Sequence, residues 1–343
     1  MQQNHQEDHV PSAGTFPKVS VVAPIHNAQA GIAAAIEQLK AISYHELEFI
    51  LVDDASSDQT SESTRNHIRH DGRFRLITLQ TNVGPGEARN VGLSAATGEY
   101  IWFCDWDDKW SPNIISTLVE NAIAFDAQIS ICRADSVTET GTSTGVVDGY
   151  DQLGSITGRE AFVDLLEGTS QGYLWNKLFL KKSIEHLEFQ PLPTHEDFHF
   201  LMRAYAVATV VSSTHHVLYH YVTRSGSLTR RREVSYVGPD ACLALAIELS
   251  QQLKLTDPDQ VTFAFRARDL VTRVIHAASL RDRPAFDSAL LLLRGERKSW
   301  HRNNIQKLPK STRLKLSALI ATGRAYFYMH HPAKMLLRRI GIK

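Results

Sequence analysis

Short apolar runs alternate with longer mixed segments over the first 130 residues of the chain. Five runs have the length and β-branched content of buried strands: 18–23, 47–52, 73–79, 99–104 and 128–132. The segments between them have helical composition: 29–40, 57–70, 85–97 and one that opens at Ser111-Pro112. Strands that alternate with helices indicate βαβ units. We therefore predict an α/β fold with a mainly parallel sheet flanked by helices.

The pattern changes in the second half of the chain. Residues 174–180 and 217–222 predict two more strands around a helix at 196–206, and residues 141–157 predict a loop or hairpin. Beyond about residue 232, long helical patterns dominate: 239–254, 261–280, 283–294 and 311–329. We predict a disordered tail over 1–17, an α/β domain over 18–232 and a helical C-terminal region over 233–343.

Composition and the distribution of charge indicate where the protein is located and which segment contacts a partner. Lys+Arg and Asp+Glu both total 37, but residues 301–343 contain ten Lys or Arg and no acid. No apolar run approaches the ~20 residues that span a bilayer, and the N-terminus has no apolar core. We predict a cytoplasmic protein without a nucleic-acid partner. Residues 301–343 predict peripheral contact with the inner face of the membrane, a packed helical region or a homo-oligomer contact.

Polar residues cluster where four of the predicted strands end. These are Asn27 after the first strand, Asp53 and Asp54 after the second, Asn82 after the third, and Asp105, Asp107 and Asp108 after the fourth. In sheets built from βαβ units, ligands bind beyond the carboxyl ends of the strands. The sequence therefore predicts a binding site at this edge of the sheet.

The acidic group at residues 105–108 is the strongest candidate for metal chemistry. Three carboxylates within four residues repel one another, and a hard divalent cation with oxygen ligands relieves that repulsion. Mg²⁺ takes one or two protein carboxylates and completes its shell with phosphate and water, which suits a nucleotide diphosphate. The alternative is an acidic turn that caps the helix opening at Ser111.

Two further segments are candidates for nucleotide contacts. Asp53 and Asp54 are suited to accept hydrogen bonds from a base or ribose, although Asp53 could instead cap its own loop with Ser56 and Ser57. Residues 82–90 form a glycine-bearing turn into a helix, and helix N-termini attract anions. This turn lacks the residues of a Walker A loop or of a dinucleotide fingerprint.

Taken together, these segments resemble family 2 glycosyltransferases of the GT-A fold. The matching segments are VSVVAPIHN, VDDASSDQT and NVGPGEARNVGLSAATGEYIWFCDWDD, in that order, and the resemblance covers about 18–232. It implies inverting transfer of a hexosyl or N-acetylhexosaminyl group from a nucleotide-diphosphate sugar, with a UDP-sugar favoured, and a Mg²⁺ or Mn²⁺ cofactor. The acceptor would be a hydroxyl of a polysaccharide, a lipid-linked glycan or another glycoconjugate.

The resemblance also implies roles for single residues in the donor site. The implied donor-site residues are Pro24 and His26 at the base pocket, Asp54 on the base with Asp53 in support, Arg89 near the nucleotide, Asp105 on the ribose, Asp107 with Asp105 on the metal, and Asn27, Asn82 and Gly84 elsewhere in the nucleotide-sugar site. Two positions depart from the family pattern. Trp106 stands where a small residue is usual, and His26 stands where Tyr is frequent.

The second half of the chain supplies the implied catalytic base. In similar enzymes an Asp at the position of Asp197 is the general base, and Glu196 is the next candidate. A carboxylate at a helix N-terminus is held ionised by the helix dipole, so we expect a charged Asp197. The alternative is an ordinary acidic first turn.

Trp175 and Lys177 match a segment that lies near donor and acceptor in relatives, and Arg224 stands in a segment that resembles the loop closing this domain. Trp175 could stack on a sugar or belong to the core, Lys177 would contact the donor, and Arg224 could bind pyrophosphate or lie solvated at the surface.

Two other functions remain open from the sequence. A catalytically inactive relative would bind nucleotide sugar without turnover. A nucleotidyltransferase would need a glycine-rich basic loop after the first strand, and residues 24–29 contain no glycine.

Overall fold

A computed structural model describes residues 16–330 except 224–235, 257, 299 and 301, together with all side chains in these ranges except those of residues 302, 303 and 307. The predicted disordered tail, apart from residues 16 and 17, lies outside the described residues. So do the predicted boundary at 232–233 and the last thirteen residues.

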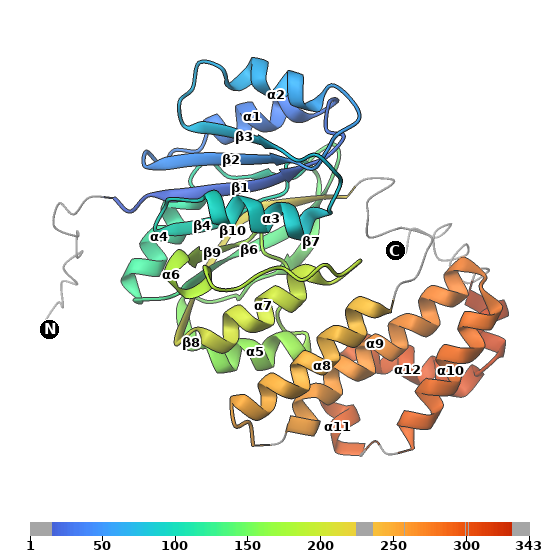
Figure 1. The fold of residues 1–343 in the computed structure, drawn as a ribbon. Coiled ribbons are helices and arrows are strands. Elements are labelled where there is room, and N and C mark those ends of the chain that lie inside the picture. The colour runs from blue at the N-terminus through green and yellow to red at the C-terminus, as the bar shows by residue number, and fades with distance from the viewer. Residues whose placement is uncertain (1–15, 224–235, 257, 299, 301, 331–343) are drawn as a thin grey trace, which may run out of the picture.

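The first part of the chain forms the predicted βαβ units. The strands are β1 (Val19–Ile25), β2 (Leu47–Asp53), β3 (Phe74–Thr78) and β4 (Tyr100–Phe103), and the intervening helices are α1 (Ile32–Lys40), α2 (Thr60–Ile68) and α3 (Pro85–Ala95). These four strands pair in parallel in the order β3-β2-β1-β4. All seven residues of β1 are buried, as expected for a strand covered on both faces. The α/β fold class is confirmed (Figure 1).

The remaining strands make the sheet mixed rather than mainly parallel. They are β5 (Lys109–Trp110), β6 (Ile129–Thr138), β7 (Ser143–Asp148), β8 (Gly154–Thr157), β9 (Lys177–Leu180) and β10 (Val210–Thr223). Within the described residues, five of the nine strand pairs are antiparallel. Strand β9 forms two of these antiparallel pairs, because it lies between β4 and β6 and runs opposite to both. Strands β4 and β6 therefore run in the same direction.

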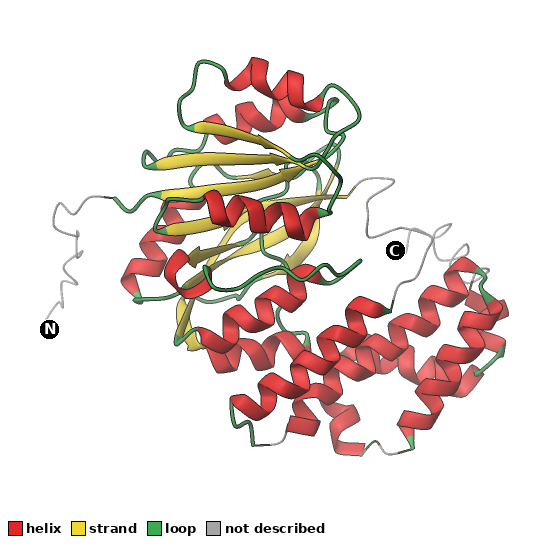
Figure 2. Ribbon diagram, viewed as in Figure 1, coloured by secondary structure: helices red, strands yellow, loops and turns green. Residues whose placement is uncertain are grey.

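Helices cover both faces of the sheet, and a helical region follows it (Figure 2). The helices alongside the second half of the sheet are α4 (Ile114–Ala124), α5 (Gly158–Glu167), α6 (Lys181–Ile184) and α7 (Glu196–Val207). The later helices are α8 (Val237–Gln252), α9 (Pro258–Leu280), α10 (Arg283–Arg297), α11 (Arg302–Lys307) and α12 (Lys310–Thr322). Helix α8 packs on α7, and α9 packs on α5. In the described part of the chain, no helix has the length and apolar character needed to cross a membrane.

The apolar side chains divide into three clusters that follow these layers. Two clusters lie against the sheet, and the third is confined to α9, α10, α12 and the segments next to them. Helix α5 begins with a capping box, because Thr157 accepts from the Glu160 N–H and Glu160 accepts from the Thr157 N–H. The end of β4 and helix α3 lie beside the start of α7, where Arg89 joins Asp105 to Glu196.

Candidate active site

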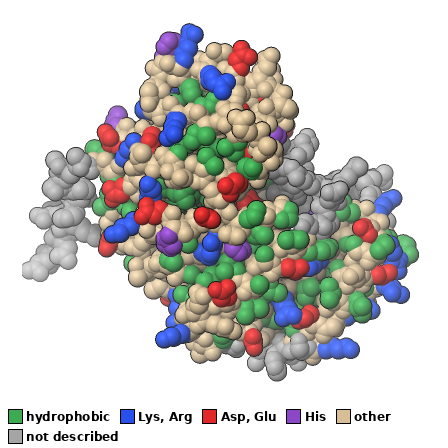
Figure 3. Space-filling model, in the orientation of Figure 1, with side chains coloured by type: hydrophobic (Ala, Val, Ile, Leu, Met, Phe, Trp, Pro, Cys, Tyr) green, Lys and Arg blue, Asp and Glu red, His purple; other side chains and the backbone are tan. Residues whose placement is uncertain are grey.

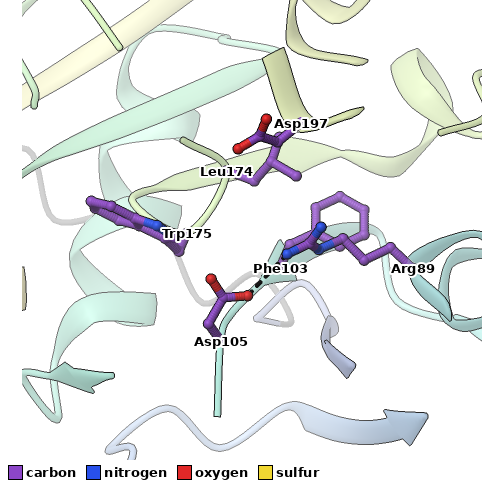
Figure 4. Close-up of a pocket in the computed structure, with 6 residues that line it drawn as sticks. All are labelled: Arg89, Phe103, Asp105, Leu174, Trp175 and Asp197. Atoms are coloured by element: carbon purple, nitrogen blue, oxygen red, sulfur yellow. Dashed lines mark hydrogen bonds and ion pairs between the residues drawn. The ribbon is translucent and has the colours of Figure 1, made fainter. Parts of the chain in front are cut away.

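A small pocket lies where β4, α3 and α7 meet. Six residues line it: Arg89, Phe103, Asp105, Leu174, Trp175 and Asp197. Asp105 follows β4, Arg89 comes from α3, and Asp197 stands in the first turn of α7 (Figure 4). The enclosed volume is about 30 Å³, which is room for little more than one water molecule. Carboxylates from two segments 92 positions apart in the sequence therefore face one cavity.

The guanidinium of Arg89 joins the two segments. Its Nη2 donates to Asp105 Oδ1 at 3.0 Å, and its Nη1 donates to Glu196 Oε1 at 3.3 Å. The side chain is 9% exposed. Burial on its own would lower the pKa of Arg89, but the carboxylates of Asp105 and Glu196 more than reverse this and raise that pKa. The group is therefore a permanent cation inside a cluster of acids.

Asp197 is not held ionised as expected from its place in α7. The pKa of Asp197 is raised to about 7, mainly by burial and next by the neighbouring charge of Glu196, which together outweigh the lowering effect of Arg89 and of the Phe198 N–H. The helix dipole contributes at most about 2 kcal/mol, which is less than the penalty for burying a charge. The side chain keeps a partly exposed surface because the pocket opens onto it. A carboxyl with a pKa near neutrality can both take up and release a proton.

The start of α7 is held from outside by α8. A side chain at Gly238 would overlap the carbonyl of Thr194, so the two backbones are in direct contact. The Cys242 thiol of α8 also lies 3.7 Å from the carbonyl of His195. His195 itself has a φ of 65°, a left-handed conformation that turns the chain into the helix. The helical region therefore fixes the approach to Glu196 and Asp197.

The three acids of the 105–108 group do not act as one cluster. Both carboxylate oxygens of Asp108 are bound inside the protein, by the Tyr219 hydroxyl at 2.9 Å and by the Val222 N–H at 2.8 Å. Burial, reinforced by the charge of Asp105, raises the pKa of Asp108 to about 8. Asp105 is paired with Arg89, and the raised pKa of Asp108 favours its neutral form, so these two acids repel each other less than the sequence suggested. Asp105 and Asp107 remain partly exposed at the end of β4.

The pair Asp53-Asp54 holds two loops in place. Asp53 accepts from the Ser56 N–H at 3.0 Å and from the Ser56 and Ser61 hydroxyls, which bears out the loop-capping alternative for Ser56. Ser57 bonds Asn27 instead. Asp54 accepts from the N–H groups of Val83 at 2.7 Å and Gly84 at 2.8 Å with separate oxygens. Both carboxylates are buried, so in this structure they shape the loops around the base pocket.

The expected residues of the base pocket lie together at the ends of β1 and β2. His26 Nδ1 donates to the Asp54 carbonyl at 2.7 Å, and the amide of Asn82 lies 3.3 Å from the same ring. Asn27 bonds Ser56 and Ser57. His26, Asn27 and Asn82 are exposed, whereas Pro24 is buried within β1. The side chains of His26, Asn27 and Asn82 thus form an exposed polar surface.

Trp175 and Lys177 have structural surroundings. The Trp175 ring stacks on Tyr219 at 4.3 Å and on Tyr173 at 4.6 Å, so it belongs to an aromatic pile and also lines the pocket. Lys177 is fully buried, and its ammonium lies 2.8 Å from Asp148 and 2.7 Å from the Tyr173 carbonyl. It is not presented to the pocket, so we leave it out of the donor site. Arg224 lies outside the described residues.

Sequence reasoning missed the residues that support the site from behind. Tyr219 binds Asp108 and carries the stack with Trp175, and Asp148 neutralises Lys177. Tyr219 lies in a segment that the family resemblance includes, but its position in the sequence does not predict the contact with Asp108. The ion pair between Arg89 and Glu196 joins residues 107 positions apart, so no local sequence pattern predicts it.

With this geometry in view, comparison with known proteins identifies the family. The family model "Glycosyl transferase family 2" matches residues 20–210, which is more than half of the chain. The chain belongs to glycosyl transferase family 2. The family 2 match covers β1 through the start of β10 and includes every residue that lines the pocket.

Relatives and solved structures agree with the family 2 assignment. The chain is 31% identical to glycosyltransferase EpsH of Bacillus subtilis over 224 residues, a match that spans 63% of each protein. It is 30% identical to the succinoglycan biosynthesis protein ExoO of Rhizobium meliloti, over 68% of each. The crystal structure of S. aureus TarS 1-349 in complex with UDP-GlcNAc has the same fold, with a TM-score of 0.64, 21% identity and coverage of 95% of this chain and 92% of that one.

We predict that Lys177 stabilises the fold and does not bind donor. Replacing Lys177 by Met leaves Asp148 buried without its cation, which should lower the free energy of unfolding by about 3–5 kcal/mol in denaturant titration. The exposed Lys182→Met variant is the control and should unfold like the parent protein. Donor affinity of the folded Lys177→Met protein should be unchanged. A stable variant that has lost donor binding would contradict this assignment.

Proposed function

We propose that this family 2 protein is an inverting glycosyltransferase that moves a hexosyl or N-acetylhexosaminyl group from a nucleotide-diphosphate sugar to an acceptor hydroxyl. The observation that carries the proposal is the meeting of Asp105, Glu196 and Asp197 around Arg89 at one pocket. A transferase of this kind needs a donor-binding acid and a proton acceptor on opposite sides of the reacting carbon. The proposed catalytic domain is 18–232.

The proposed donor site extends from the pocket along the strand ends. The nucleotide would lie over His26, Asn27 and Asn82, which offer exposed polar groups at the ends of β1 and β3. Asp54 supports that surface by holding the turn at Val83 and Gly84. A UDP-sugar is favoured because TarS, which shares the fold, was solved with UDP-GlcNAc. A polysaccharide or other glycan acceptor is supported by ExoO, a succinoglycan biosynthesis protein.

Asp197 is the proposed general base. Glu196 is already engaged with Arg89, whereas Asp197 lines the pocket and its pKa lies near neutrality. The acceptor hydroxyl would give its proton to Asp197 while its oxygen forms the new bond to the anomeric carbon. The bond from that carbon to the diphosphate oxygen breaks at the same time, and the nucleoside diphosphate leaves. A single displacement inverts the anomeric configuration.

Mg²⁺ or Mn²⁺ is the proposed cofactor, with Asp107 as its main ligand and Asp105 as the second. The donor set fits, because two partly exposed carboxylates follow β4 and hard oxygen ligands suit these cations. Among the described residues, no group of three or more His, Cys, Asp or Glu side chains is placed to hold an ion. A cation that takes its other ligands from diphosphate and water needs no such group. When bound, it would offset the charge of the leaving diphosphate.

Loss of the Asp107 carboxylate should remove the metal dependence of donor binding. We expect UDP affinity of Asp107→Ala, measured by calorimetry with Mn²⁺, to fall to the value that the parent protein shows with a chelator. Asp151→Ala, which removes a carboxylate whose side chain is 82% exposed, should bind UDP as the parent does. Metal-dependent binding that survives in Asp107→Ala would refute the assignment of this ligand.

Loss of the Asp197 charge should separate donor binding from transfer. Asp197→Asn should bind UDP-sugar normally and lose about 10²- to 10⁴-fold in turnover, measured as transfer or as donor hydrolysis. Because only ionised Asp197 accepts a proton, the rate of the parent enzyme should fall as pH decreases through about 7. A parent-like rate in Asp197→Asn would place the base at another residue.

A further inference from the structure

Helix α12 has an inner face that packs inside the protein and an outer face that does not. Thr312, Leu316 and Leu319 are buried, and the two leucines belong to the third apolar cluster, where α12 packs on α9. These residues of α12 are therefore already used in internal packing. What remains open to a partner is the opposite side of the helix.

That opposite side places three cations around exposed apolar side chains. Lys310, Arg313 and Lys315 are exposed and lie within about one turn of Leu314, whose side chain is 63% exposed. Ile320 is 47% exposed on the same helix. In the described part of the molecule, none of the three cations has a hydrogen-bond or ion-pair partner. We call Lys310, Arg313, Leu314, Lys315 and Ile320 the basic C-terminal face.

Exposed apolar side chains are frequent in this part of the chain. Of the fourteen large hydrophobic residues that are exposed among the described residues, six fall within 291–329: Leu291, Leu292, Leu314, Ile320, Tyr328 and Met329. The end of α12 at Gly323 contacts Arg294 of α10, one turn beyond Leu291, so the two helices contribute to one side of the helical region. Figure 3 shows one side of the helical region, on which hydrophobic side chains are interspersed with Lys or Arg and with Asp or Glu side chains.

The charge of the region selects the kind of partner. Helix α12 carries Lys310, Arg313 and Lys315 and no Asp or Glu, so charge complementarity favours a negatively charged partner. A second copy that used the same face would bring cation against cation, because a two-fold interface pairs each patch with itself. A soluble polyanion would satisfy the cations but would leave Leu314 and Ile320 in water. A surface that is both anionic and apolar just beneath satisfies both sets of side chains.

We propose that the basic C-terminal face adsorbs peripherally to a bilayer that contains anionic lipid. This goes beyond the proposed glycosyl transfer and does not depend on it. The cations contact phosphate head groups, and Leu314 and Ile320 enter the boundary between head groups and acyl chains. Because α12 stays packed on α9, the protein rests on the bilayer by a fixed face. The start of α8, which contacts the approach to Asp197, belongs to the same helical region.

The test is co-sedimentation of the full chain with vesicles. We expect binding to vesicles of phosphatidylcholine with phosphatidylglycerol, no binding to phosphatidylcholine alone, and release at roughly 0.5 M salt, where charges are screened beyond a few ångströms. The triple variant Lys310→Glu, Arg313→Glu, Lys315→Glu should lose at least about tenfold in vesicle affinity. Leu314→Ser should weaken binding without changing its salt dependence.

A charge-matched control separates this face from net charge. The triple variant Arg69→Glu, Arg75→Glu, Lys182→Glu makes the same change in net charge at exposed positions just after α2, on β3 and on α6. It should bind vesicles as the parent does, and all variants should share the thermal unfolding temperature of the parent. Failure of the parent to bind anionic vesicles, or parent-like binding by the α12 triple variant, would overturn the proposal. Binding to soluble polyphosphate but not to vesicles would assign the face to a soluble polyanion and would also overturn it.

Discussion

The buried guanidinium of Arg89 is the interaction on which the site depends. It binds Asp105, which follows the fourth parallel strand, and Glu196, which opens α7, and so ties the nucleotide-side loops to the helix that carries Asp197. Removing one partner from a buried ion pair costs about 3–5 kcal/mol, because a charge is left without compensation. Arg89 therefore both connects the two segments and supplies the positive charge among Asp105, Glu196 and Asp197.

The same tie explains how Asp197 is suited to act as a base. Burial and the charge of Glu196 raise its pKa, and Arg89 opposes them, with a result near neutrality. The carboxylates farther from Arg89 have other hydrogen-bond donors. Asp108 accepts from the Tyr219 hydroxyl and the Val222 N–H, and Asp54 accepts from the N–H groups of Val83 and Gly84. Outside the pocket, α8 presses on Thr194 and fixes the entry to α7. Thus the helical region supports the geometry of the site.

The sequence predicted the parts of this arrangement that have local or periodic signals. The strands, the polar groups at their ends and the family came from runs, turns and motif order. The antiparallel insertion of β9 could not be predicted, because strand direction depends on tertiary pairing and residues 174–176 before β9 form a loop instead of a strand. The position of Lys177 inside the core and the raised pKa of Asp197 both depend on burial, which no spacing of residues reveals. Local motifs identify candidates, and packing decides their charge.

The most direct measurement of this account is the pH dependence of turnover after changes at Arg89. Arg89→Gln removes the charge that lowers the pKa of Asp197, so the acidic limb of the rate profile should move to higher pH. Arg89→Lys keeps a charge and should move the limb less. Both variants must first retain cooperative unfolding and UDP binding. An acidic limb that stays in place in Arg89→Gln would contradict the claim that Arg89 and Asp197 share one site.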